Sequence, residues 1–115
     1  MPGFGRHRNR RRMMGQMDDP RSRFFMALAS DQRIKIIEAL KEGEKSSAEI
    51  ISILGLDPSV VSRHLTLLRN VGLVSARKEG VSLYFFLGDE RALDVIELAT
   101  KISKDWFKGF QSFFD

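Results

Sequence analysis

The stretch DPSVVSRHLTLLRNVGLV, at 57–74, predicts one short helix whose start and end are both marked. Asp57 suits the N-cap position, because its side chain can accept a hydrogen bond from an unpaired amide of the first turn. Pro58 follows at the first helical position, where the amide hydrogen that proline lacks would have had no partner. Gly72 marks the end of the helix.

At about 100° per residue, this helix has an apolar side and a polar side. The apolar stripe consists of Val61, Leu65 and Leu68, extended by Val60, Leu67 and Val71. The opposite face carries Ser59, Ser62, Arg63, Thr66, Arg69 and Asn70. None of these six residues is acidic and each can form hydrogen bonds, as side chains that meet phosphates and base edges do. The alternative is an ordinary solvated surface, although such a surface usually mixes Glu with Lys.

A second helix is predicted just before it. Ser46-Ser47-Ala48-Glu49 matches a capping box, in which a serine hydroxyl accepts from the third amide and Glu49 reaches back. The pattern predicts a helix over Ser47–Leu54, ended by Gly55. Two short helices joined by a three-residue turn that contains glycine form a helix-turn-helix.

The remaining elements complete a fold that is mainly α with a small β-hairpin. Two helices are expected first, Arg21–Ala29 and one from Ser30 or Asp31 to about Glu42. After Gly72 the apolar period changes to two, which predicts strands Leu73–Arg77 and Val81–Leu87 with a turn at Lys78-Glu79-Gly80. A long final helix is expected from a cap at Asp89 to about Phe114.

The final helix carries more apolar surface than one small core can cover. Its stripe runs through Leu93, Ile96, Ala99, Ile102, Trp106, Phe110 and Phe113 or Phe114. A second copy of the chain is the simplest partner for such a surface. The predicted dimer interface consists of Phe24, Phe25, Leu28, Ile96, Ile102, Trp106, Phe110 and Phe113. An intramolecular cap over the core is the alternative, and a small apolar ligand within this surface is a further one.

The net charge of +4 is unevenly distributed along the 115 residues. Residues 1–17 contain five arginines and no acid, whereas the rest holds 14 basic and 15 acidic residues. We therefore expect a disordered basic arm at 1–19, which lies along phosphates or is a solvated tail, and one folded domain at 20–115. No apolar run is long enough for a membrane helix, the start lacks the apolar segment of a secretory signal, and there is no cysteine. These features favour the cytoplasm.

The predicted order of helices, hairpin and long last helix is that of a winged helix-turn-helix, and three segments resemble the ArsR-type family of repressors. These segments are SDQRIKIIEAL, DPSVVSRHLTLLRNVGLV and SARKEGVSLYFFL, and the resemblance covers about residues 20–115. It implies a homodimer, paired through its first and last helices, that binds a palindromic operator and is released by an effector. It also implies that His64 lies near the DNA backbone. From the residues alone, a half-buried His64 bonded to a carbonyl is an equal alternative.

The sequence departs from the metal-sensing members of that family. The segment that carries cysteines in some members is SSAEIISIL here, and the last helix has acidic residues but no histidine. With His7 and His64 as its two histidines, one chain cannot build a multi-histidine zinc site. We expect no metal and no cofactor, and the sequence leaves the effector open.

The predicted function is that of a sequence-specific regulator that binds double-stranded DNA. The resemblance implies that this regulator is a repressor. The predicted DNA-binding residues are Ser59, Ser62, Arg63, His64, Thr66, Arg69, Arg77 and Lys78. Ser59, Ser62, Arg63 and Thr66 would face the major groove. Arg69 would contact a phosphate, and Arg77 and Lys78 would reach the minor groove or the backbone. The alternative is a winged helix used for protein–protein contact. An enzyme is not expected, because no paired histidines or phosphate-binding loop are present.

Overall fold

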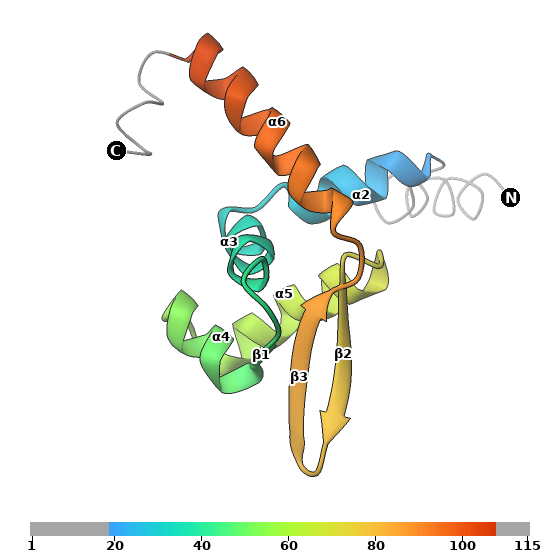
Figure 1. Cartoon of the computed structure of the whole chain (residues 1–115), viewed down its shortest axis with the longest axis vertical. Coiled ribbons are helices and arrows are strands. Elements are labelled where there is room, and N and C mark those ends of the chain that lie inside the picture. The colour runs from blue at the N-terminus through green and yellow to red at the C-terminus, as the bar shows by residue number, and fades with distance from the viewer. Residues whose placement is uncertain (1–18, 108–115) are drawn as a thin grey trace, which may run out of the picture.

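The computed structural model of the chain describes residues 19–107, where helices dominate and three short strands form one sheet. In chain order the elements are α2 (Pro20–Leu28), α3 (Asp31–Leu40), β1 (Lys45–Ser46), α4 (Ser47–Leu54), α5 (Pro58–Asn70), β2 (Val74–Glu79), β3 (Ser82–Leu87) and α6 (Arg91–Trp106) (Figure 1). The mainly helical winged helix-turn-helix predicted from the sequence is confirmed. Residues 1–18 of the predicted arm, and Phe110 and Phe113, lie outside the described residues.

Four helices begin where a side chain accepts a hydrogen bond from an amide of the first turn. The acceptors are Asp19, Ser30, Ser46 and Asp57, at the N-caps of α2, α3, α4 and α5. These starts agree with the sequence predictions to within one residue. Helix α3 ends at Leu40 rather than at about Glu42, because the amide of Gly43 turns back to the Leu40 carbonyl.

Helix α6 also begins near its predicted cap. The carboxylate of Asp89 accepts from the Arg91 amide at 3.0 Å, although Glu90 is the residue that directly precedes the helix. The described part of α6 ends at Trp106, and Phe107 follows in an extended conformation. The predicted end of this helix, near Phe114, lies outside the described residues.

The turn of the hairpin was predicted two residues too early. Glu79 pairs with Ser82, so the loop consists of Gly80 and Val81, and Lys78 lies within β2 opposite Leu83. Gly80 has a φ of 62°, and in the described range every residue with a positive φ is a glycine. A two-residue loop with a left-handed glycine at its first position matches the hairpin twist better than a turn at Lys78. This hairpin, β2 and β3, is called the wing below.

The third strand was not predicted. Strand β1 pairs with β3, with Lys45 opposite Phe85 and Ser46 opposite Tyr84, so the sheet order is β1-β3-β2. A two-residue strand has no period of its own in the sequence, and it exists because β3 offers it an edge to pair with. The wing is thereby attached to the chain segment that leads into α4.

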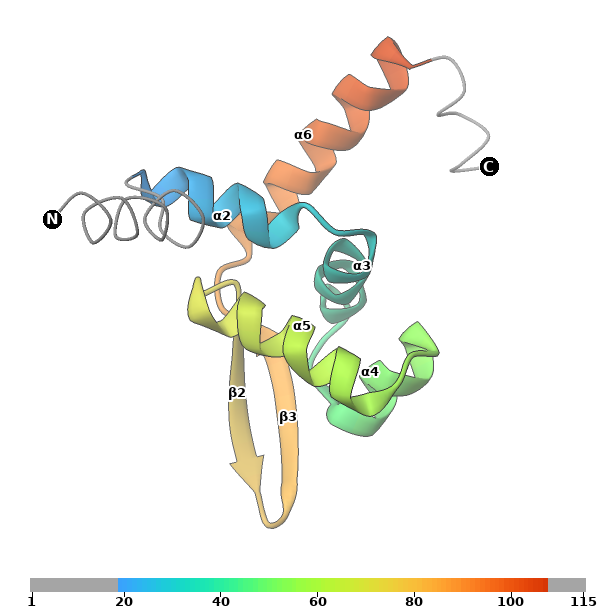
Figure 2. The same ribbon diagram turned by 180° about the vertical axis from the view of Figure 1, so that it is seen from behind.

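The core lies where the helices meet the base of the wing. Its fully buried side chains include Ile36 and Ile37 of α3, Ile50 of α4, and Val61 and Leu68 of α5. At the end of β3, a side chain on Gly88 would come within 2.3 Å of the Gly72 carbonyl oxygen, so glycine lets this strand pass the end of α5. The wing and α6 extend from the body in opposite directions (Figures 1 and 2).

Candidate nucleic-acid interface

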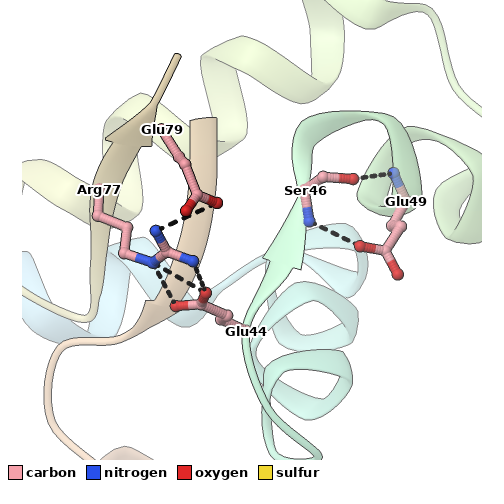
Figure 3. Close-up of polar contacts among 5 residues, drawn as sticks. All are labelled: Glu44, Ser46, Glu49, Arg77 and Glu79. Carbon is pink, nitrogen blue, oxygen red and sulfur yellow. Dashed lines mark hydrogen bonds and ion pairs between the residues drawn. The ribbon is translucent and has the colours of Figure 1, made fainter. Parts of the chain in front are cut away.

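Helix α5 is held by the turn and caps that the sequence predicts. Ser46 and Glu49 form both bonds of the capping box at the start of α4, at 3.1 and 2.9 Å (Figure 3). Helix α4 ends at Gly55, whose φ of 64° is left-handed, and Asp57 begins α5 two residues later. The chain thus reverses tightly, and α5 lies on the outside of the helix-turn-helix beside the wing (Figure 2).

The two faces of α5 are divided almost as predicted. Val61, Leu65 and Leu68 are buried, and all six residues of the predicted polar face are exposed. Leu67, which was expected to extend the apolar stripe, is 41% exposed. The prediction that Leu67 belongs to the core is wrong, because its side chain points about 100° away from that of Leu68. An exposed leucine therefore lies on the face that also carries Arg63.

Hydroxyl groups on this face are partly engaged within the helix. Ser59 donates its hydroxyl hydrogen to Asp57 at 2.7 Å, and Thr66 donates to the Ser62 carbonyl at 2.9 Å. Each of these oxygens can still accept a hydrogen bond, but neither donates freely. The Ser59 hydroxyl is also the main reason why the pKa of Asp57 is lowered. Asp57 thus remains an anion at the start of the helix.

The arginines of α5 are the free donors of this surface. Arg63 and Arg69 are exposed and form no hydrogen bond or ion pair with another described residue. Arg69 and Ser62 line a shallow pocket of about 130 Å³ between α5 and Leu83 of the wing. At about 100° per residue, Arg63 lies roughly opposite the buried stripe of the helix. Two guanidinium groups are therefore available at different positions across the exposed face.

By helical spacing, His64 lies on the side of α5 opposite Ser62 and Arg69, which line the pocket beside the wing. Its Nδ1 is 3.2 Å from Nη1 of Arg33, a residue of α3 that the sequence interpretation did not single out. The histidine is half-buried, as in the alternative in which it is a structural residue bonded to a carbonyl. Its partner, however, is a guanidinium rather than a carbonyl. Burial, followed by the charges of Arg33 and Arg63, lowers the pKa of His64.

The two predicted cations of the wing have different surroundings, and those of Arg77 are drawn in Figure 3. Nε of Arg77 donates to Oε1 of Glu44 at 2.9 Å, and Nη1 lies 3.6 Å from Oε2 of Glu79. Its guanidinium also lies over the ring of Tyr84, 4.8 Å from the centroid. Lys78 is exposed and forms no ion pair with another described residue. The sequence interpretation missed Glu44, which is 33 residues away from Arg77.

The predicted dimer residues fall into two groups. Leu28 and Ile96 belong to the core of the same chain, and Phe24 packs against that core. Phe25, Ile102 and Trp106 are exposed, with 59%, 56% and 88% of their surfaces accessible. A groove of about 790 Å³ runs between α6 and the pair α2 and α3, with Phe25, Leu28 and Ile96 among its lining residues. The first and last described helices thus share an apolar surface.

Within residues 19–107 the structure also bears on metal ions and membranes. In this range no group of three or more His, Asp or Glu residues is placed to hold a metal ion. No helix in the same range is long and apolar enough to cross a membrane.

Comparison with known proteins is informative. Residues 30–76 match the family model described as bacterial regulatory protein, arsR family. The probable mercury resistance operon repressor of Streptomyces lividans is 39% identical over 87 residues, which cover 76% of this chain and 70% of the relative.

Solved structures agree with this likeness. The crystal structure of Rv0081 from Mycobacterium tuberculosis superposes with a TM-score of 0.70 at 30% identity, covering 77% of this chain and 90% of that protein. The homodimeric winged helix-turn-helix DNA-binding domain of Mb0332 from Mycobacterium bovis gives a TM-score of 0.68 at 28% identity, covering 80% of this chain and 91% of that domain.

Proposed function

The chain belongs to the arsR family of bacterial regulatory proteins, and from this premise we propose that it is a homodimeric transcriptional regulator that binds double-stranded DNA. The observation that carries the proposal is the exposed face of α5, which has no acid between Pro58 and Asn70. Its two arginines are unpaired among the described residues. A helix with this face, held by a helix-turn-helix beside a wing, suits the major groove.

Each predicted residue has a role in this proposal. Arg63 reads a base edge, where arginine most often pairs with guanine, and Ser62 lies beside it. Ser59 and Thr66 act as acceptors, because their hydroxyl hydrogens are engaged within α5. Arg69 and Lys78 contact phosphates, which position the protein without reading sequence.

Arg77 is the residue whose proposed role changes. Its guanidinium is surrounded by Glu44, Glu79 and the ring of Tyr84, so a phosphate would have to compete with two carboxylates. We therefore assign it to the attachment of the wing, and we expect Lys78 to supply the cation of the wing.

The homodimer is proposed from the exposed apolar residues of α2 and α6. Phe25, Ile102 and Trp106 expose apolar side chains to water, and a twofold partner would bury them. The Mycobacterium bovis domain is a homodimer with the same architecture. A twofold dimer places its two α5 helices on half-sites roughly 34 Å apart, so the operator should be a palindrome.

We also propose that the protein acts as a repressor in the cytoplasm, since the Streptomyces relative is named as a repressor. We do not extend the word mercury in that relative's name to this chain. Soft metal ions favour thiolate ligands, and the sequence contains no cysteine. The effector of this protein, if it has one, is left open.

The decisive experiment is the selection of binding sites from random duplex DNA with the purified full chain. Recovery of a palindrome with half-sites about one helical turn apart would support the proposal. Enrichment of no sequence, together with a monomer in solution, would favour the rival function, a winged helix that docks on another protein.

A further inference from the structure

Arg33 joins three helices through one guanidinium group. Its Nε donates to the Ala27 carbonyl at 2.6 Å and its Nη2 to the Met26 carbonyl at 3.2 Å, both at the end of α2. The third contact, from Nη1, is with Nδ1 of His64 on α5, at 3.2 Å. The carbonyls of a last helical turn lack helical partners and attract cations, so the guanidinium is well placed there.

The contact with Arg33 determines which nitrogen of His64 can carry the hydrogen. A guanidinium has donors and no acceptor, so Nδ1 must accept and cannot be protonated. A neutral imidazole with a bare Nδ1 has its hydrogen on Nε2. Charged histidine, which has a hydrogen on both nitrogens, is incompatible with the contact. The lowered pKa of His64, caused first by burial, agrees with a neutral ring.

The second nitrogen of His64 reaches solvent. Nε2 forms no hydrogen bond with another described residue, and in residues 19–107 the one buried side-chain polar atom without a partner is Oε1 of Gln32. On α5, His64 and the pair Ser62 and Arg69 lie on opposite flanks of the helix, and the pair faces the wing. When a helix lies in the major groove, its flanks face the two sugar–phosphate walls.

We propose that Arg33 is a positioning residue, which holds His64 as the neutral Nε2–H form so that this N–H donates to a DNA phosphate on the wall opposite the wing. The same guanidinium ties α5 to the end of α2, the helix that carries Phe25 of the proposed dimer surface. The phosphate contact rests on the proposed function. The state of the imidazole does not, because it follows from the contact within one chain.

The first test uses nuclear magnetic resonance on the full chain labelled with ¹⁵N and without DNA. The sequence has two histidines, so a His7→Gln variant identifies the His64 signals. We expect two-bond couplings that show a protonated Nε2 and a bare Nδ1. Arg33→Gln should give a mixture of the two neutral forms and raise the pKa of His64. The matched control is Arg23→Gln, because Arg23 on α2 is exposed and forms no hydrogen bond with another described residue.

Two outcomes would overturn the positioning role. One is a hydrogen on Nδ1 in the unchanged protein, and the other is an Arg33→Gln spectrum identical with that of Arg23→Gln. If Arg33→Gln does not fold, Arg33→Lys replaces it. Lysine keeps the charge, but its single ammonium group cannot span carbonyls on α2 and an imidazole on α5.

The second test compares two substitutions of His64 for duplex binding. The amide nitrogen of glutamine can occupy the place of Nε2, so His64→Gln keeps the outward donor. Asparagine is too short for this and offers an acceptor near the place of Nδ1, so His64→Asn keeps the Arg33 contact alone. We expect His64→Asn to weaken binding to operator and random DNA alike, by roughly tenfold, and His64→Gln to weaken it less.

Equal affinity of His64→Asn and the unchanged protein would overturn the phosphate contact. If the unchanged protein binds no duplex DNA, the proposed function fails and the phosphate contact fails with it. In that event the imidazole couplings still decide whether Arg33 positions His64.

Discussion

Arg77 of the wing is bonded to Glu44, the residue just before β1, through Nε and Nη2 of its guanidinium. The pair joins the outer strand β2 to the far side of the sheet, across β3 (Figure 3). The ring of Tyr84, on β3, lies beneath the guanidinium. This contact lowers the pKa of Glu44 and raises that of Arg77, chiefly through the hydrogen bonds between them. Both groups are therefore charged at neutral pH, and their charges face each other rather than a ligand.

We expect Arg77→Ala to change DNA binding less than Lys78→Ala does. Loss of a phosphate contact reduces the slope of log affinity against log salt by about 0.9, and Lys78 is the unpaired cation of the wing. Fluorescence titration of one duplex at several salt concentrations measures both slopes.

Substitution of Glu44, the partner of Arg77, tests the same assignment from the other side. Glu44→Gln should make Arg77 available and strengthen DNA binding, whereas Glu42→Gln, at an exposed position two residues earlier, should have a smaller effect. A decrease of the salt slope by Arg77→Ala that equals the decrease by Lys78→Ala would contradict the assignment of Arg77 to wing attachment.

Arg63→Ala should relax specificity rather than abolish binding. A bidentate contact between arginine and a base contributes about 1–3 kcal/mol of discrimination, and Arg63 lies roughly opposite the buried stripe of α5. Binding should be measured on the selected operator, on single-base variants and on random DNA. Lys78→Ala is the comparison, because it should weaken all sequences similarly. Equal losses on operator and random DNA for Arg63→Ala would show that Arg63 reads no base.

Ser46→Ala should lower the free energy of unfolding by about 1 kcal/mol, because it removes the hydroxyl that accepts from the Glu49 amide. Ser47 lies next to it but provides no capping bond. Urea denaturation of both alanine variants measures the difference. If Ser47→Ala destabilises the protein as much as Ser46→Ala, the capping box is not what fixes the start of α4.

Acid should weaken the start of α6 as Asp89 becomes protonated. Hydrogen bonds from the Arg91 side chain, and then from its amide, lower the pKa of Asp89 to about 2 from 3.8. A depressed carboxyl pKa stabilises the folded state fully above the unfolded value of 3.8, and this contribution is lost as the pH falls through about 2.

Thermal unfolding of Asp89→Asn between pH 5 and pH 2 tests this expectation. Between these two pH values, the melting temperature of the variant should fall by less than that of the unchanged protein. Asp94→Asn removes a carboxylate from the first turn of the same helix and is the control. If Asp89→Asn and the unchanged protein respond identically to acid, the contact with Arg91 does not stabilise the fold.

Ile102→Glu should convert the proposed dimer into a folded monomer. A charge on the apolar surface of α6 would be buried without a partner at a twofold interface, which is strongly unfavourable. Val81→Glu is the control, because Val81 is 99% exposed in the loop of the wing. The wing extends away from α6 (Figure 1). Sedimentation equilibrium measures the mass and circular dichroism the helix content. A dimer that persists in Ile102→Glu would exclude this part of α6 from the interface.

The sequence predicted the elements well where the signal is local. Helix starts at Ser46 and Asp57 depend on residues within one turn, and the apolar stripe of α5 repeats within thirteen residues. The turn of the hairpin was wrong by two residues, because several polar residues near Gly80 suit a turn and the strand register decides among them. Strand β1 has too few residues to show a pattern.

What the sequence by itself determined is the helix-turn-helix with its wing, and the acid-free face of α5 that points outward. The tertiary structure decided which of the polar residues remain available. Within residues 19–107 Arg77 is paired and its neighbour Lys78 is not, because Glu44 reaches Arg77 from 33 residues away. His64 accepts from Arg33 across 31 residues, so its free hydrogen is on the other nitrogen. Such contacts depend on how α3, α5 and the sheet pack together, and no local pattern of residues encodes that geometry.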